Sequence, residues 1–104
     1  MSTTEILEER GNNYGNFDKL AELTQQLEFT VIKHFIDTHP AGSVLPPYMR
    51  ESLHMILQKV ARAVNGNPYY DDSWQDIAGY AQLVVNKLNE PNAPTYQGEE
   101  QNHD

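Results

Sequence analysis

The chain has 104 residues, and its 15 acidic residues outnumber its 7 basic ones, which gives a formal net charge of −8. This charge disfavours binding to long nucleic acids, because proteins that grip them need a positively charged face. The absence of cysteine excludes disulfides, thiolate zinc sites and cysteine nucleophiles. No apolar run approaches the roughly 20 residues of a membrane span, so we expect a soluble, cytoplasmic protein without a membrane partner.

The acidity is uneven along the chain. Residues 90–104 hold four acidic residues and no Lys or Arg, and they carry half of the net charge. A segment with so few apolar side chains buries too little surface to offset the entropy of ordering it. We therefore expect a helical domain at residues 1–89 and a disordered acidic tail at 90–104, whose role is either solubilising or partner-binding.

The first predicted helix is short. Ser2 and Glu5 have the spacing of a capping box, which predicts a helix over residues 3–9 that Gly11 closes. Residues 10–16 contain two glycines and three asparagines and are predicted to form a loop.

A longer second helix follows Asn16, which is a good N-cap, and Pro40 and Gly42 end it. Its apolar residues recur three or four positions apart, as in an amphipathic helix: they are Phe17, Leu20, Leu23, Leu27, Val31 and Phe35. Ile32 and Ile36 widen this stripe. The width allows dimerisation through this helix, and we expect a homo-oligomer.

Two further helices complete the predicted fold. Pro46 and Pro47 fit the first turn of the third helix, and Gly66 closes it. Asp72 is expected to cap the fourth helix, with Gln75 completing a capping box. The stripe predicted to be buried on that helix consists of Trp74, Ile77, Ala78, Ala81, Val84, Val85 and Leu88. The predicted fold class is all-α, a small bundle of one short and three long helices.

Charged residues are expected to gather where the third and fourth helices join. In an antiparallel pair of these helices, Lys59 and Arg62 lie near Asp72 and Asp76. Loops would add Arg10, Tyr14, Tyr69 and Tyr70 to this group. One interpretation is a nucleotide site, with the two cations on phosphate and a tyrosine stacked on the base. The other is an ion-pair network that joins the two helices.

Residues 72–80 read Asp-Ser-Trp-Gln-Asp-Ile-Ala-Gly-Tyr and resemble the signature of an uncharacterised family of small proteins from phages and prophages. Two other segments look like that family's elements: Lys59-Val-Ala-Arg62, and residues 10–17 with Arg10, Tyr14 and Phe17. The resemblance spans Ile6 to Leu88, and it implies a phage-type protein that acts in the cytoplasm of a bacterial host.

That family is in turn distantly similar to the MazG-like all-α nucleoside triphosphate pyrophosphatases. Those enzymes hold Mg²⁺ with a Glu-x-x-Glu pair on one helix and a Glu-x-x-Asp pair on the next. The resemblance implies Mg²⁺ as a candidate cofactor on Asp72 and Asp76, which would stand in for the second pair. The sequence departs from the pattern, because Ser73 replaces a glutamate and the first pair is replaced by Lys59 and Arg62.

Two functional hypotheses result. The first is nucleotide handling: the protein binds and sequesters a nucleotide, or it hydrolyses a nucleoside triphosphate to the monophosphate and pyrophosphate. The second is a non-enzymatic acidic protein that binds and modulates a host protein. The sequence narrowly favours the first, and it leaves open whether the protein is an enzyme and which nucleotide or partner it binds.

Overall fold

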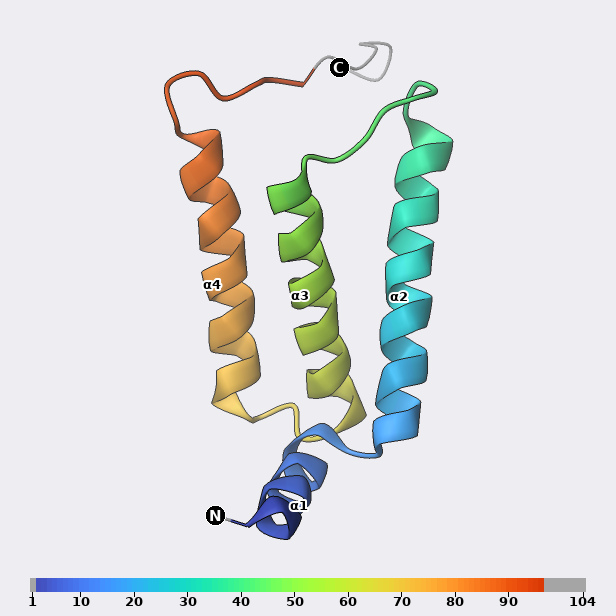
Figure 1. Ribbon diagram of the computed structural model, residues 1–104, viewed down its shortest axis with the longest axis vertical. Coiled ribbons are helices and arrows are strands. Elements are labelled where there is room, and N and C mark those ends of the chain that lie inside the picture. The colour runs from blue at the N-terminus through green and yellow to red at the C-terminus, as the bar shows by residue number, and fades with distance from the viewer. Residues whose placement is uncertain (1, 97–104) are drawn as a thin grey trace.

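The computed structural model describes residues 2–96, which form four helices (Figure 1). These are α1 (Thr3–Tyr14), α2 (Phe17–Thr38), α3 (Pro47–Asn65) and α4 (Asp71–Leu88). No strand occurs in this part of the chain, so the prediction of an all-α fold is confirmed. None of the described helices is long and apolar enough to cross a bilayer.

Local sequence signals set several helix ends as predicted. The Ser2 hydroxyl caps α1 by accepting a hydrogen bond from the backbone N–H of Glu5 at 3.1 Å. The Asn16 side chain caps α2 in the same way through the N–H of Lys19, at 3.0 Å. Helix α3 begins at Pro47, where the missing N–H costs no hydrogen bond.

Two helix starts or ends differ from the prediction. Helix α1 continues to Tyr14 instead of ending at residue 9. Gly11 lies within the helix, and Gly15, whose φ is 81°, follows its last residue. The side-chain amide of Asn13 also donates to the carbonyl of Glu9 at 3.1 Å, which ties down the added turn.

The start of α4 is the second difference. Asp72 is not its N-cap: the helix begins one residue earlier, after Tyr70, and no side chain caps it. The side-chain amide of Gln75 donates to the carboxylate of Asp71, and Gln75 does not close a capping box with Asp72. The carboxylate of Asp72 is therefore left for a different partner, which is described below.

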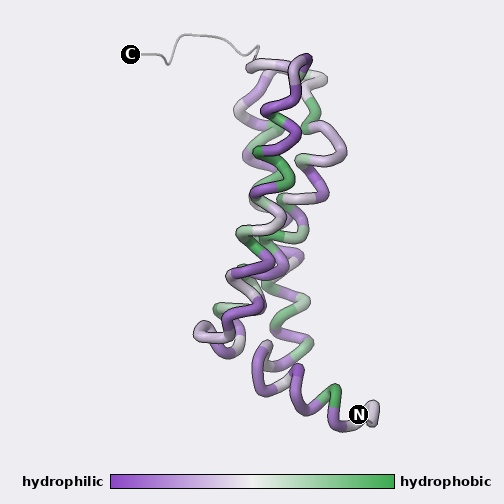
Figure 2. The backbone as a smooth tube through the Cα atoms, turned by 90° about the vertical axis from the view of Figure 1, so that its left-hand side faces the viewer, coloured by the Kyte–Doolittle hydropathy of each residue, from purple (hydrophilic) through white to green (hydrophobic). Residues whose placement is uncertain are grey.

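Helix α3 is the middle element of a single layer of three long helices. It packs against α2 on one side and α4 on the other, whereas α2 and α4 make no contact with each other (Figure 1). After a turn of 90°, the long helices overlap in one narrow column (Figure 2). Helix α1 lies at the lower end of the layer in Figure 1 and contacts α2 and α3. The bundle is therefore open on its broad faces.

Polar contacts between neighbouring helices support this layer. His54 Nδ1 on α3 lies 2.9 Å from a carboxylate oxygen of Glu28 on α2. Lys59 on α3 pairs with Asp76 on α4 at 3.0 Å, which fits the antiparallel arrangement predicted for these two helices. Each edge of α3 therefore carries one long-range polar link besides its apolar contacts.

Only small side chains are buried in this layer. Among residues 2–96, the buried apolar residues are Ala61 and Ala63, and the buried polar ones are Thr24, Ser52 and Ser73. Such small side chains let α3 approach its neighbours closely. No large side chain of the described residues is fully buried, because a single layer covers each helix only along its edges.

The apolar stripe predicted for α4 is buried only in part, which corrects that expectation. Ile77 and Val84 are half-buried, but Trp74, Val85 and Leu88 are 51%, 45% and 46% exposed. These three residues lie on a side of α4 that α3 does not cover. The periodicity located the helix correctly, but it did not show that one face of the helix would lack a neighbour.

The chain after α4 runs without a helix over residues 89–96. It passes over the upper end of the layer in Figure 1 towards α2, where the Tyr96 ring lies edge-on to the His39 ring with 6.2 Å between their centroids. The rest of the acidic segment predicted to be disordered, residues 97–104, lies outside the described residues.

Candidate functional site

The end of α3 is fastened to the end of α1 by Asn65. Its side-chain amide donates to the backbone carbonyls of Tyr14 at 2.8 Å and of Asn16 at 3.0 Å. The backbones approach so closely that a Cβ atom on Gly15 would lie 2.3 Å from the Asn65 carbonyl oxygen. A side chain larger than hydrogen does not fit there. This junction fixes the position of Tyr14 relative to α3.

Tyr14 in turn contacts Arg62, one turn of α3 above the junction. The guanidinium carbon of Arg62 lies 4.5 Å from the centroid of the Tyr14 ring, a cation–π contact. Within residues 2–96, no carboxylate forms a salt bridge with Arg62. Its Nε atom is buried and has no hydrogen-bond partner there. Such an unsatisfied donor costs about 1–3 kcal/mol unless a ligand accepts from it.

Arg62 lines a pocket of about 570 Å³ between α1, α2 and α3. Arg10 and Tyr14 line the same pocket from α1, and the apolar part of its wall includes Leu20 from α2. No Asp or Glu belongs to its lining, which holds two arginines. In a chain of net charge −8, this is a local positively charged hollow.

Lys59 and Asp76 lie outside this pocket and neutralise each other. Lys59 Nζ is 3.0 Å from a carboxylate oxygen of Asp76, and the Lys59 side chain is only 12% exposed. The prediction that these two residues are neighbours agrees with this geometry. Of the two interpretations offered for the charged group, the ion-pair network describes this pair, and a ligand site is better supported at Arg62.

Tyr70 and Asp72 form a third part of the predicted group. The Tyr70 hydroxyl donates to the Asp72 carboxylate at 3.0 Å. This hydrogen bond and the negative charge of Asp72 raise the pKa of Tyr70 above its ordinary value of 10.0. The Tyr70 ring also packs edge-on against Tyr14, with 5.9 Å between centroids. Tyr69, by contrast, is 91% exposed.

The predicted Mg²⁺ ligands are both engaged with other groups. Mg²⁺ can be held by one or two carboxylates together with substrate phosphates, but Asp72 accepts from Tyr70 and Asp76 pairs with Lys59. Nowhere in residues 2–96 do three or more Asp, Glu or His side chains lie close enough to share a metal ion. The donor set therefore fits a resident Mg²⁺ poorly, and Mg²⁺ binding stays a prediction.

The polar residues of the pocket wall were not among the predicted site residues. Thr24, Gln25 and Gln58 line the pocket together with Arg62. Gln58 lies four residues before Arg62, and residues at this spacing share one face of a helix. That spacing was a usable signal, but glutamines on helices are too common for it to be distinctive.

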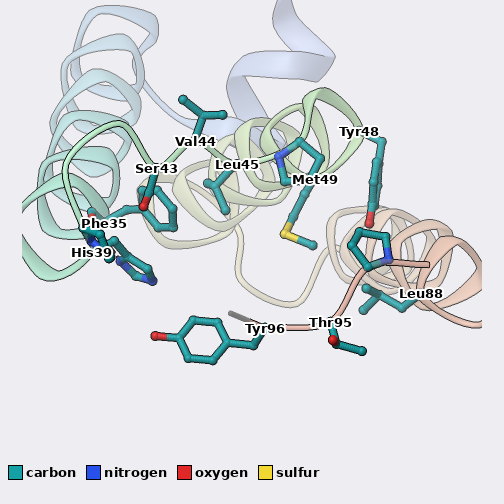
Figure 3. Close-up of a pocket in the computed structure, with 13 residues that line it drawn as sticks. Phe35, His39, Ser43, Val44, Leu45, Tyr48, Met49, Leu88, Thr95 and Tyr96 are labelled. Atoms are coloured by element: carbon teal, nitrogen blue, oxygen red, sulfur yellow. Dashed lines mark hydrogen bonds between the residues drawn. The ribbon is translucent and has the colours of Figure 1, made fainter. Parts of the chain in front are cut away.

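A second pocket, of about 540 Å³, lies at the opposite end of the layer (Figure 3). Its lining contains no Lys, Arg, Asp or Glu. The Phe35 and His39 rings stack there, with 4.0 Å between their centroids, and Tyr96 lies below them in the view of Figure 3. Since it holds no fixed charge, this pocket is less suited to an ionic ligand than the pocket at Arg62.

Comparison with known proteins gives one relationship. No curated protein and no solved structure matches the chain. A family model described as a domain of unknown function, DUF6378, matches residues 2–87. The match covers the pocket at Arg62 and nearly all of the four helices, and it agrees with the prediction of an uncharacterised family. The chain thus belongs to the DUF6378 family.

Proposed function

We propose that the protein binds a nucleotide in the pocket between α1, α2 and α3, with the phosphate on Arg62. The observation that carries this proposal is the buried, unpartnered Nε of Arg62 beside a pocket without acidic residues. A phosphate oxygen would accept from that donor and remove the cost of leaving it unsatisfied.

The two arginines suit an anionic ligand with several oxygens, such as a phosphate chain. Arginine presents a planar set of donors that matches phosphate oxygens in pairs. Arg10 and Arg62 line the pocket from different helices, so that a phosphate chain could be contacted from two sides. The positive charge is local, and the acidic remainder of the chain would repel longer polyanions.

The rest of the pocket suits a base. Phe17 lines it and is 75% exposed, so its ring offers a stacking surface at the rim. Gln25 and Gln58 supply amide donors and acceptors for the polar edge of a base. The volume of about 570 Å³ falls within the range typical of small-molecule sites.

Binding is better supported than hydrolysis. Asp72 and Asp76, the carboxylates that a MazG-like reaction would require, do not line the pocket, and each already has a partner. We therefore propose a nucleotide-binding accessory protein of phage type in the bacterial cytoplasm. Pyrophosphate release with Mg²⁺ is the competing form of the same proposal.

Calorimetric titration with a panel of ribo- and deoxyribonucleoside triphosphates tests the proposal, first in a chelator and then with Mg²⁺. We expect the nucleotide to bind in the presence of the chelator and Arg62→Met to lower the affinity at least tenfold. We expect no release of pyrophosphate when Mg²⁺ is added. Arg50→Met is the matched control, because Arg50 is an exposed arginine on the same helix outside this pocket. No binding across the panel, or binding that Arg62→Met leaves unchanged, would overturn it.

The second hypothesis, a protein that binds a host protein, draws support from a different region. Phe29 and Ile36 on α2 are 68% and 63% exposed and lie seven residues apart on one face of the helix, and exposed apolar patches mark contact sites with other proteins. Capture of a bacterial protein by the wild-type chain but not by an Ile36→Glu variant would favour this function. A chain that captures nothing under the same conditions would count against it.

A further inference from the structure

Helix α4 has two apolar faces, but only one of them meets α3. Ser73, Ile77, Tyr80 and Val84 are buried or half-buried and form the α3-facing side. The second face is exposed and consists of Trp74, Ala78, Ala81, Val85 and Leu88, which we call the α4 stripe. At about 100° per residue, the two faces are adjacent on the helix surface.

The spacing within the α4 stripe is that of a helix–helix interface. Its members are separated by four, three, four and three residues, the alternation of a coiled-coil seam. Large side chains stand at its two ends, Trp74 and Leu88, and the small Ala78 and Ala81 occupy the middle. Small residues at the centre allow another helix to approach closely.

The surroundings of the α4 stripe contain little charge. Its outer flank carries Asp71 in the first turn and then the neutral side chains of Gln75, Gln82 and Asn86, whereas Asp72, Asp76 and Lys87 lie on the opposite side of the helix. Two copies of a chain with net charge −8 repel each other. An apolar seam whose flank carries a single acid, on the far side from the α4 acids at 72 and 76, is a surface on which two such copies can meet.

The accessible surface area also fits a second copy of this chain as the partner. The accessible surface of the chain is 7939 Å². The nine residues outside the described range would have an accessible surface of roughly 1,500 Å² if they were fully extended. After this area is subtracted, residues 2–96 still have roughly 900 Å² more accessible surface than a compact protein of their size. A standard protein interface buries about 800 Å² on each partner. The excess is spread over the open layer, and it is large enough to supply the area that one copy contributes to a dimer.

We propose that the α4 stripe is a homodimer interface in which α4 pairs with α4 of a second copy in antiparallel orientation. A two-fold axis beside Ala81 then packs Trp74 of each copy against Leu88 of the other, and Ala78 against Val85. The antiparallel orientation also keeps the Asp71 residues of the two copies at opposite ends of the interface. A parallel pair would place the acidic first turns of the two helices side by side.

The oligomeric state of the full chain in solution, measured by light scattering on a sizing column, tests this interface. We expect wild type to have twice the mass of the chain, and Ala81→Glu and Val85→Glu to have the mass of one chain. Both substituted side chains are exposed in a single copy, so the helical circular dichroism should persist. Leu83→Glu is the matched control, because Leu83 is 56% exposed on the opposite side of α4, and it should remain dimeric.

Cross-linking tests the contact at the two-fold axis, and a Leu88→Cys variant adds the orientation, because Leu88 meets its own copy only in a parallel pair. The chain has no cysteine, so Ala81→Cys introduces a single thiol at the expected two-fold axis, and mild oxidation should link two copies, whereas Leu83→Cys should not. A wild-type monomer at all concentrations would overturn the proposal. So would a dimer that Ala81→Glu leaves intact, or a monomer whose α4 stripe binds a different protein.

Discussion

The ammonium nitrogen of Lys59 on α3 lies 3.0 Å from a carboxylate oxygen of Asp76 on α4, and the two side chains differ sharply in exposure. The Lys59 side chain is 12% exposed, whereas that of Asp76 is 48% exposed. Asp76 is therefore needed to stabilise the charge of the mostly buried Lys59, whereas water can solvate the Asp76 carboxylate without the lysine. This asymmetry leads to different consequences for removing one partner or the other.

Asp76→Asn should destabilise the protein more than Lys59→Met does. The asparagine variant leaves a mostly buried ammonium without its counter-charge, and we expect the free energy of unfolding to fall by about 1–2 kcal/mol. Lys59→Met leaves a solvated carboxylate and a well-packed apolar side chain, and should change it by less than about 1 kcal/mol. Urea denaturation measures both values. Equal losses for the two single variants would contradict the asymmetry.

Arg62→Met should not weaken the fold, although the residue lies in the interior of the junction. The substitution gives up a cation–π contact worth about 0.5–1 kcal/mol but removes a buried donor that has no partner among the described residues. We expect an unchanged or slightly higher free energy of unfolding. Asn65→Ala, which breaks two hydrogen bonds at the same junction, should lower it by about 1–3 kcal/mol. A large loss for Arg62→Met would make the arginine structural.

Periodicity and capping residues were sufficient to predict the helices but not their arrangement. The 22-residue α2 and the start of α3 at Pro47 agree with the prediction, because each has a strong local signal. The prediction failed at Gly11, where contacts at the α1 junction extend a helix beyond a residue that usually weakens one. It also failed for the α4 stripe, because apolar spacing does not say which partner covers a face.

The residues of the candidate site were likewise predictable only where helix order and spacing bring them together. The neighbourhood of Lys59 and Asp76 was predictable from helix order and spacing. Arg62 and Tyr14 were predicted to belong to one group, but not that the guanidinium of Arg62 would lie over the Tyr14 ring. That contact depends on Asn65 reaching the carbonyls of the α1–α2 turn. No local pattern encodes a hydrogen bond between residues 51 positions apart.

Asp72→Asn should lower the pKa of Tyr70 towards its ordinary value of 10.0. In the wild type, the hydroxyl donates to Asp72 only while it is protonated, and ionisation would place a phenolate beside a carboxylate. The raised pKa therefore stabilises the folded state below pH 10, and this contribution disappears as the pH rises through the raised pKa. An NMR titration, with the Tyr70 ring assigned through Tyr70→Phe, measures the change. Asp76→Asn should leave the Tyr70 pKa in place, and an equal drop for both variants would refute the assignment to Asp72.

Gly79→Ala should stabilise the protein. A glycine in the middle of a helix costs about 0.5–1 kcal/mol relative to alanine, and mid-helix glycines are usually explained by close approach of another helix or by room for a ligand. Neither explanation holds within the described residues, because a Cβ atom on Gly79 meets nothing within 4 Å.

The contrast is Gly15→Ala, at a residue with a φ of +81° whose added Cβ would lie 2.3 Å from the Asn65 carbonyl oxygen. This variant should lower the free energy of unfolding by more than about 1 kcal/mol and disturb the Tyr14–Arg62 contact beside the pocket. Thermal denaturation of both variants against wild type measures the difference. A loss of stability for Gly79→Ala would indicate that a partner molecule approaches α4 on the side of Gly79, a side that the α4 stripe does not include.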